Sequence, residues 1–262
     1  MKPRKSLGQN FLIDKNIQSK IIRACNLSGN DTVLEIGPGR GEITQYLLEQ
    51  AGYVIAVEID NNLYQGLIER FGSFKNLELL NADILKLSLS GLRGLGGGKK
   101  FKVIANIPYY ITTPIIARLL SHGSLFSEIY LTLQKEFAER LTAGPGTKDY
   151  GAFSCFAQFY TKPKLIFTIS SSAFWPRPKV DSCLARLEIL DEPSVKVKDE
   201  GMFFKIIRAG FNQRRKLFKN NLSRIFPQPK AASCLSKLGL DEKVRAEDLC
   251  LSDFARIADY FT

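Results

Sequence analysis

A glycine-rich turn between a strand and a helix constrains the fold of this chain more than any other feature. The segment TVLEIG, Thr32–Gly37, has the apolar and β-branched character of a buried strand, and the glycines of GPGRG follow at once. Helical patterning then begins in ITQYLLEQ, Ile43–Gln50. A strand, a glycine turn and a helix in this order predict the first unit of an α/β sheet whose turn faces a ligand.

The same alternation continues over the first 190 residues. Further strands are predicted in YVIAVEID, LELLNADIL, FKVIANIPY and EIYLTLQ, and two late strands in LIFTIS and CLARLEIL. Helical segments such as NLYQGLIERF separate the earlier ones. This pattern indicates the α/β class with a doubly wound, mostly parallel, Rossmann-like sheet, in which ligands bind beyond the carboxyl ends of the strands.

A change of pattern near residue 190 predicts a second domain. DEPS, Asp191–Ser194, is typical of a linker, and the chain after it has helical patterning only. We therefore expect a ligand-binding domain at residues 1–190 and a small all-helical domain at 191–262. The glycine-rich segment Ser88–Lys100 lacks periodicity and is interpreted as a flexible, functionally neutral surface loop.

Composition narrows the class of partner. The formal net charge of +11 favours a polyanion such as a nucleic acid. Five scattered cysteines without a CxxC pair, together with a single histidine, argue against a zinc site and against a disulfide framework. No apolar run approaches the roughly 18 residues that a membrane span needs. We expect a soluble, monomeric, cytoplasmic protein that binds no metal and no membrane.

Acidic residues at successive strand ends predict the cofactor. Glycines Gly37 and Gly39 belong to a GxGxG pattern, which differs from the GxGxxG of pyrophosphate-binding dinucleotide sites. Glu58 ends the second strand, where its carboxylate can accept hydrogen bonds from both ribose hydroxyls, and Asp83 ends the third, where it suits an adenine amine. A solvated strand end and a helix cap are the plain alternatives for the two acids. The set as a whole predicts S-adenosylmethionine, with Ile59 and Ile84 beside it.

The tetrapeptide Asn106-Ile-Pro-Tyr109 at the end of the fourth strand is the most specific short motif. It resembles the motif of methyltransferases that act on the amino groups of nucleobases. The Asn106 side-chain oxygen and a backbone carbonyl at Ile107–Pro108 can accept hydrogen bonds from an adenine amine and localise its lone pair. Pro108 restricts the backbone, and Tyr109 can stack on the base. Taken alone, the tetrapeptide also fits an ordinary strand-to-loop turn.

A second aromatic motif, FWPRPKVD, lies between the two late strands. We expect Phe174 to stack on the face of the base opposite Tyr109, and Trp175 to serve in packing. Arg177 and Lys179 are candidates for phosphate contacts. A base must leave its helix, or come from a loop, to reach such a pocket.

The chain resembles the ribosomal RNA adenine dimethyltransferases of the kasugamycin-sensitivity type over nearly its whole length. The resemblance rests on LGQNFL, EIGPGRGEIT, VEID, NADIL, NIPYYITTPI, LQKEFAERL, AFWPRPKVDS and GFNQRRKLFKNNL. It implies a Rossmann-like methyltransferase that places two methyl groups on each of two adjacent adenosines, in a hairpin loop near the 3′ end of the 16S RNA, late in small-subunit assembly. It also implies that Asn10 and Leu12 contact the cofactor. Gln9 lies in the same segment and is a further candidate for the pocket.

A basic run in the helical domain predicts the RNA-binding surface. No acidic residue occurs between Met202 and Lys230. A run of charge is usually a solvated face, but the lack of compensating carboxylates favours phosphate contacts and a partnership with the small ribosomal subunit. The candidate RNA-binding residues are Arg208, Arg214, Arg215, Lys216, Lys219 and Arg224.

Three other functions fit parts of this pattern. An erythromycin-resistance methyltransferase, which modifies a large-subunit adenosine, would share the fold and the Asn-Ile-Pro-aromatic motif. A non-catalytic assembly factor could keep the fold, although intact Glu58, Asp83 and Asn106 argue against binding alone. A DNA amino-methyltransferase would normally carry its own sequence-recognition domain, and none is evident in the sequence.

Overall fold

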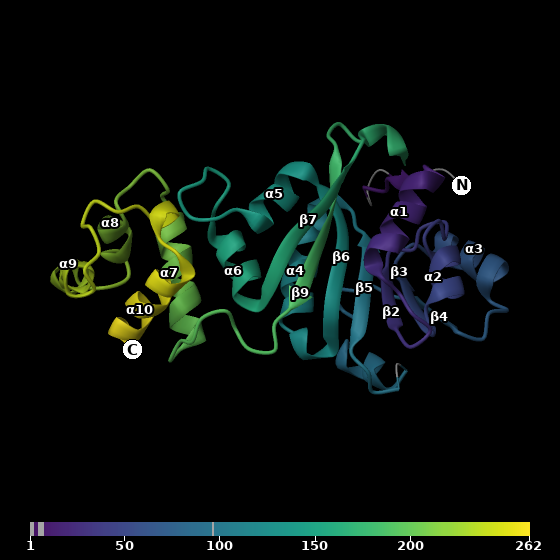
Figure 1. Ribbon diagram of the computed structural model, residues 1–262, viewed down its shortest axis with the longest axis horizontal. Coiled ribbons are helices and arrows are strands. Elements are labelled where there is room, and N and C mark those ends of the chain that lie inside the picture. The colour runs from purple at the N-terminus through teal and green to yellow at the C-terminus, as the bar shows by residue number, and fades with distance from the viewer. Residues whose placement is uncertain (1–2, 5–7, 96) are drawn as a thin grey trace. The chain divides into compact units, whose positions relative to one another are not determined.

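A seven-stranded sheet with helices between its strands confirms the predicted α/β class. The computed structural model describes residues 3–4, 8–95 and 97–262 (Figure 1), so Leu7 of the LGQNFL motif and Gly96 of the glycine-rich segment lie outside the described residues. Seven strands form one sheet in the order β4-β3-β2-β5-β6-β9-β7. The strands are β2 (Thr32–Ile36), β3 (Tyr53–Glu58), β4 (Leu77–Asn81), β5 (Phe101–Asn106), β6 (Phe126–Gln134), β7 (Thr161–Ile169) and β9 (Ser182–Ile189).

The strand directions are those of a doubly wound sheet. β2 pairs in parallel with both β3 and β5, β3 pairs in parallel with β4, and β5 with β6. Only the last part of the chain reverses, since β9 runs antiparallel to β6. The change of strand order at β2 separates β3 from β5, and such a switch point opens a crevice at the carboxyl ends of the strands. Glu58 and Asn106 therefore lie on either side of the glycine turn.

Aspartate side chains cap the first turns of two of the N-terminal helices. Asp14 accepts hydrogen bonds from the first backbone N–H groups of α1, and Asp60 does so for α3. The N-terminal helices are α1 (Lys15–Cys25), α2 (Thr44–Gln50), α3 (Asn61–Phe71), α4 (Thr112–Leu120), α5 (Lys135–Thr142) and α6 (Ala152–Tyr160). The C-terminal helices are α7 (Glu200–Phe211), α8 (Phe218–Leu222), α9 (Gln228–Lys237) and α10 (Leu251–Phe261). Across the described residues, no helix is long and apolar enough to cross a membrane.

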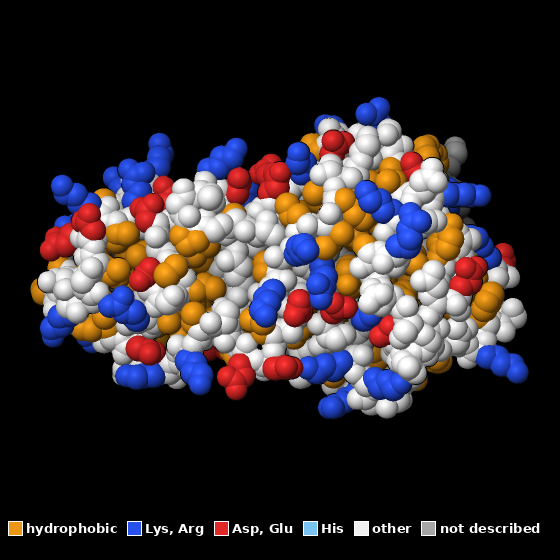
Figure 2. Space-filling model, in the orientation of Figure 1, with side chains coloured by type: hydrophobic (Ala, Val, Ile, Leu, Met, Phe, Trp, Pro, Cys, Tyr) orange, Lys and Arg blue, Asp and Glu red, His pale blue; other side chains and the backbone are white. Residues whose placement is uncertain are grey.

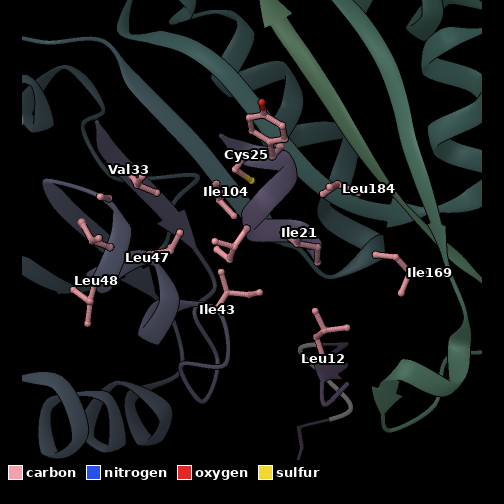
Figure 3. Packing of buried hydrophobic residues seen from close by; sticks show 14 of the residues in the cluster. Leu12, Ile21, Cys25, Val33, Ile43, Leu47, Leu48, Ile104, Ile169 and Leu184 are labelled. Atoms are coloured by element: carbon pink, nitrogen blue, oxygen red, sulfur yellow. The ribbon is translucent and has the colours of Figure 1, made fainter. Parts of the chain in front are cut away.

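One hydrophobic cluster joins the sheet to the helices beside the glycine turn (Figure 3). It takes Ile21 and Cys25 from α1 and Leu47 from α2, and these pack with Val33 of β2 and Ile104 of β5. Burying such side chains contributes roughly 1.5–3 kcal/mol each and fixes the strand ends relative to one another. The cluster also includes Leu12, so the segment that leads into α1 is held against the sheet.

A separate two-stranded pair brings distant segments together. β1 (Phe11–Leu12) pairs antiparallel with β8 (Phe174–Trp175), with Phe11 opposite Trp175 and Leu12 opposite Phe174. Because successive side chains of a strand point to opposite faces, Phe174 and Trp175 have different environments. This pair places the N-terminal motif beside the FWPRPKVD motif.

The chain divides into two compact units, and the division differs from the predicted boundary. The first unit is Met1–Ala138 with Lys164–Ile189, and the second is Glu139–Pro163 with Leu190–Thr262. The sequence predicts a single boundary near residue 190, and residues 139–163 depart from that prediction because they belong to the second unit. Their allocation has an aromatic cause, since Phe159 of α6 lies 4.9 Å from Phe203 of α7 and 5.1 Å from Phe204, measured between ring centroids. Contacts of this kind are not visible in local periodicity.

The glycine-rich segment is partly ordered, where a flexible loop was expected. Ser90–Gly94 forms a 3-10 helix, and Leu89 and Leu92 are buried. Leu89 and Leu92 anchor the segment to the domain, while Gly94, Gly97 and Gly98 are exposed.

Candidate active site

One cavity in the first unit gathers almost all of the predicted cofactor-binding and catalytic residues. Strands β2, β3 and β5 end at its wall, and the segment from Gly8 to Leu12 borders it. Phe174 is the only predicted cofactor or catalytic residue that does not line it. Those that do are Gln9, Asn10, Leu12, Gly37, Gly39, Glu58, Ile59, Asp83, Ile84, Asn106, Pro108 and Tyr109.

The glycine turn is built around the Glu58 carboxylate. Gly37 and Gly39 have φ angles of 69° and 64°, which side chains other than glycine rarely adopt. The backbone N–H of Gly39 donates to Glu58 Oε2 at 3.1 Å, and the N–H of Asp60 donates to Oε1 at 2.9 Å. Glu58 is 4% exposed, and burial raises the pKa of its carboxyl. A carboxylate oxygen accepts more than one hydrogen bond, so Glu58 can still receive a pair of ribose hydroxyls.

Two further carboxyl groups border the cavity, and sequence reasoning missed both. Glu35 of β2 is fully buried and accepts a hydrogen bond from Thr44 Oγ1 at 2.7 Å. Burial raises its pKa to about 8, so the group is largely protonated at neutral pH. Burial also raises the pKa of Glu42. An acidic residue inside an otherwise apolar strand run was the available signal for Glu35.

The side of the cavity beyond Glu58 combines a carboxylate with apolar surface. Asp83 Oδ1 accepts a hydrogen bond from the Leu85 backbone N–H at 2.9 Å. This cap-like contact is the plain alternative to cofactor binding that the sequence allows for this residue. The second carboxylate oxygen of Asp83 has no protein donor among the described residues and can accept from an amine. Ile59 is 53% exposed, and Ile84 is buried. An apolar side chain left open beside a carboxylate suits a flat heteroaromatic ring with an amino group.

The arrangement of Asn106 is the main chemical feature of the cavity. Its Nδ2 donates to the backbone carbonyl of Asn10 at 2.9 Å. The donor end of the amide is thereby held by protein, and Oδ1 remains as an acceptor. Tyr109 shares a 2.7 Å hydrogen bond with Ser182 Oγ, which orients its ring, and burial raises the pKa of its phenol. The end of β5 thus presents an acceptor and a fixed aromatic ring.

The two aromatic residues of FWPRPKVD have exchanged their expected environments. Phe174 is 2% exposed and packs in the hydrophobic cluster with Leu12, so the structure does not bring it to the cavity. Trp175 is 43% exposed, where packing was expected. Its ring lies 4.9 Å from the Arg40 guanidinium carbon, which lies 4.3 Å from the Phe11 ring. The alternation of strand β8 explains the exchange, because only one of two neighbours can face the core.

The candidate phosphate ligands of this motif are engaged differently. Arg177 Nε donates to Ser171 Oγ at 3.0 Å, so this guanidinium also supports its own loop. Lys179 is exposed. Arg177 is therefore partly occupied by a contact within its own loop, whereas the exposed Lys179 is available to a polyanion.

The basic run of the second unit does have compensating carboxylates, contrary to our expectation from the run itself. Arg214 pairs with Glu247 at 3.1 Å, and Lys219 pairs with Glu242 at 3.0 Å. Both acids lie outside the run in sequence and reach it only through folding. Lys and Arg side chains project from this unit with acidic ones between them (Figure 2). Of the six candidate RNA-binding residues, Arg208, Arg215, Lys216 and Arg224 are exposed and have no acidic partner among the described residues.

The second unit also has a surface pocket that joins this run to other segments. Arg214 and Arg215 line it together with Lys148 from the loop before α6 and Arg245 from the segment before α10. Glu247 lies within the pocket and contacts Arg214. Four cations around one carboxylate leave a net positive site that suits a phosphate group.

No group of three or more His, Cys, Asp or Glu side chains suited to a metal ion occurs within residues 3–4, 8–95 and 97–262. The acceptors and apolar surface of the cavity fit an organic cofactor. Glu58 suits vicinal hydroxyls, Asp83 an exocyclic amine, and exposed Ile59 an aromatic ring, and these are the groups of an adenosine.

Comparison with known proteins agrees with this geometry. The family described as "Ribosomal RNA adenine dimethylase" matches residues 1–262. A protein named Ribosomal RNA small subunit methyltransferase A from Moorella thermoacetica is 44% identical over 98% of this chain and 91% of its own length. One with the same name from Pelotomaculum thermopropionicum is 45% identical over 99% of this chain and 91% of its own.

Two solved structures share this fold, and the first also supports the family assignment. A dimethyladenosine transferase from Plasmodium falciparum superimposes with a TM-score of 0.79 and 30% identity, covering 94% of this chain and 95% of that one. The 23S rRNA methyltransferase ErmE shares the fold, with a TM-score of 0.74 and 24% identity over 95% of this chain and 98% of its own. The chain therefore belongs to the ribosomal RNA adenine dimethylase family, whose members methylate adenosine of ribosomal RNA with S-adenosylmethionine as the methyl donor.

Proposed function

We propose that this enzyme dimethylates N6 of two adjacent adenosines in a hairpin loop near the 3′ end of 16S RNA. It acts as a monomer in the cytoplasm, on the small ribosomal subunit late in assembly. The observation that carries the proposal is that Asn106 and Tyr109 border the same cavity as Glu58 and the glycine turn. A nucleobase amine held at the end of β5 would therefore lie next to the methyl donor.

The residues of the cavity have separate roles in binding the cofactor and in orienting the target amine. S-adenosylmethionine supplies an electrophilic methyl group on its sulfonium. Glu58 and Asp83 bind the adenosine part of the cofactor. Asn106 Oδ1 accepts a hydrogen bond from the adenine amine, and the Pro108 region offers a backbone carbonyl for the second proton. Two acceptors hold the nitrogen lone pair on the line of attack, and such positioning supplies much of the rate enhancement.

Tyr109 completes the binding of the target base. Its ring can stack on the adenine, which is worth about 1–3 kcal/mol. The hydrogen bond between the Tyr109 phenol oxygen and Ser182 Oγ keeps the ring in this orientation. The raised pKa of the Tyr109 phenol keeps it neutral, so the ring adds no charge beside the cofactor. The proton of the methylated amine can leave to solvent, because the amine becomes acidic only after it has taken the methyl group.

The proposed RNA-binding surface comprises the candidate residues of the basic run and the phosphate pocket beside it. We expect Arg215→Ala with Lys216→Ala to weaken binding to small subunits about ten-fold at 0.15 M salt. The salt dependence of log Kd should flatten by about 2, because each phosphate contact contributes about 0.9 to the slope. Arg214 and Lys219 should matter less, since carboxylates already neutralise them.

A matched control removes the same charge elsewhere in the second unit. Lys196→Ala with Lys198→Ala takes away two exposed lysines outside the run. Filter binding at several salt concentrations should show wild-type affinity for this control, and all variants should bind S-adenosylhomocysteine equally. Equal losses in the two double variants would mean that net charge alone, and not this surface, attracts the RNA.

The function is tested by methyl transfer from radiolabelled S-adenosylmethionine to ribosomal subunits that lack these methyl groups, followed by nucleoside analysis. We expect N6,N6-dimethyladenosine in the small-subunit RNA. Transfer to the large subunit alone would instead assign the resistance-type activity. Tight subunit binding without transfer to either subunit would make the protein an assembly factor and end the catalytic proposal.

A further inference from the structure

Asp60 lies next to the cofactor pocket and makes contacts beyond those that a helix cap needs. It is 3% exposed and follows Glu58 at the end of β3. Its two carboxylate oxygens serve different parts of the chain. Oδ1 accepts from the backbone N–H of Asn62 at 2.9 Å and of Leu63 at 3.5 Å, and so caps α3.

The second oxygen holds the N-terminal segment. Gln9 Nε2 donates to Asp60 Oδ2 at 3.3 Å, and Arg4 Nε lies 3.2 Å from the same oxygen. The Gln9 amide is itself oriented, because its Oε1 accepts a hydrogen bond from the Arg4 backbone N–H at 2.8 Å. A helix cap needs only one oxygen, so this second set of contacts is a separate use of the side chain.

The segment held by Asp60 reaches the target-base site within two residues. We call residues 8–12 the strap, since they border the cavity from Gly8 to Leu12. The Asn10 carbonyl of the strap accepts the hydrogen bond from Asn106 Nδ2 at 2.9 Å. This bond decides which end of the Asn106 amide is available as an acceptor.

Other contacts keep the strap close to the end of β5. Gly8 has a φ angle of 57°, and a Cβ there would lie 3.2 Å from the Tyr110 ring and 3.5 Å from Pro108 Cβ. Asp60 is also joined to the ribose-binding acid, since its N–H donates to Glu58 Oε1 at 2.9 Å. One buried aspartate thus connects the cofactor acid, the strap and, through the strap, Asn106.

We propose that Asp60 is a positioning residue, which fixes the strap through Gln9 so that the Asn10 carbonyl orients Asn106 toward the target amine. The proposal rests on the proposed function of Asn106. It predicts that loosening the strap slows transfer even when the cofactor site is saturated. A purely structural role would instead lower stability and leave the saturated rate unchanged.

Asp60→Asn separates the two roles of the side chain. Asparagine caps helices as well as aspartate does, so α3 keeps its cap, while the amide nitrogen cannot accept from Gln9 or Arg4. We expect the Kd for S-adenosylhomocysteine to rise about ten-fold, the size of effect for losing a hydrogen bond to a charged group. The kcat at saturating cofactor and subunit should fall about ten-fold, and KM for the subunit should stay within about two-fold.

The matched control is Asp199→Asn, which makes the same change at the cap of α7. Asp199 accepts from the Met202 backbone N–H at 3.0 Å and has no strap to hold. Its kcat and Kd should equal those of the wild type. Both variants should melt within a few degrees of the wild type, and a fall in kcat that follows only a loss of folded Asp60→Asn protein would overturn the proposal.

A double-mutant cycle tests the path through Gln9. Gln9→Ala should lower kcat by itself, and adding Asp60→Asn should lower it further by less than Asp60→Asn does alone, because both changes break the Gln9–Asp60 hydrogen bond. Losses that multiply would show that the two residues act independently and would refute the positioning role. If the wild type transfers no methyl group to either subunit, the proposed function fails. If the wild type is active and Asp60→Asn matches it in kcat and Kd, only the positioning inference fails.

Discussion

Asn106→Ala is expected to lower kcat for methyl transfer about 10²–10³-fold while the protein stays folded. The substitution removes the side-chain oxygen that accepts from the target amine, and losing one preorganised polar group at a reacting centre typically costs about 2.7–4 kcal/mol. The side chain lines the cavity and, among the described residues, makes one hydrogen bond to protein, to the Asn10 carbonyl. Single-turnover transfer at saturating cofactor measures the effect.

Asn76→Ala is the control for deleting an asparagine side chain. Asn76 Nδ2 donates to the backbone carbonyls of Leu48 at 3.1 Å and Ala51 at 3.4 Å, away from the cavity. This variant should lose stability by about 1–3 kcal/mol, because two carbonyls lose their donor, and should keep its saturated rate. A wild-type rate for Asn106→Ala would show that the amide does not accept from the target amine.

Gly41→Ala is expected to destabilise the first unit by about 3 kcal/mol. Gly41 is the last glycine of GPGRG and has a φ angle of 83°, which costs another residue roughly 1–2 kcal/mol. An added Cβ would lie 2.3 Å from Phe71 Cε2, and overpacking a buried ring typically costs about 1–3 kcal/mol more. Thermal unfolding should report a fall in Tm of about 6–12 °C.

Gly66→Ala makes the same glycine-to-alanine change but is expected to raise the stability of the protein. Gly66 lies inside α3, and no heavy atom lies within 4 Å of a Cβ built there. Alanine is favoured over glycine in a helix interior by about 1 kcal/mol, so Tm should rise by about 2–4 °C. If both variants melted alike, the Phe71 contact would not be what requires glycine in the turn.

The local sequence pattern was sufficient to predict the strands of the sheet in the first unit. β2 is predicted at Thr32–Gly37 and observed at Thr32–Ile36. The strand predicted as the fourth, β5 in the structure, ends at Asn106 as predicted. Buried parallel strands read as continuous apolar runs, and the caps and turns between them are short, so each signal lies within a few residues. The order of the strands then brings Gly37, Glu58 and Asn106 to one edge.

Relations between distant segments were not available from the sequence. Glu247 and Glu242 neutralise cations of a run that contains no acid, and Phe159 packs α6 against Phe203 of α7 within the second unit. The exchange of Phe174 and Trp175 depends on how β8 pairs with β1, far away along the chain. A one-residue change of register reverses which neighbour is buried, so composition alone cannot decide it.

The sequence by itself determined the chemistry of the cavity, because the identity and spacing of its acids, glycines and amide are local. Tertiary structure alone decided their orientation. The Asn10 carbonyl holds the donor end of the Asn106 amide, and Asp60 holds the segment that carries Asn10. Hydrogen bonds between residues far apart in sequence form only after folding, and they convert a set of suitable side chains into an oriented site.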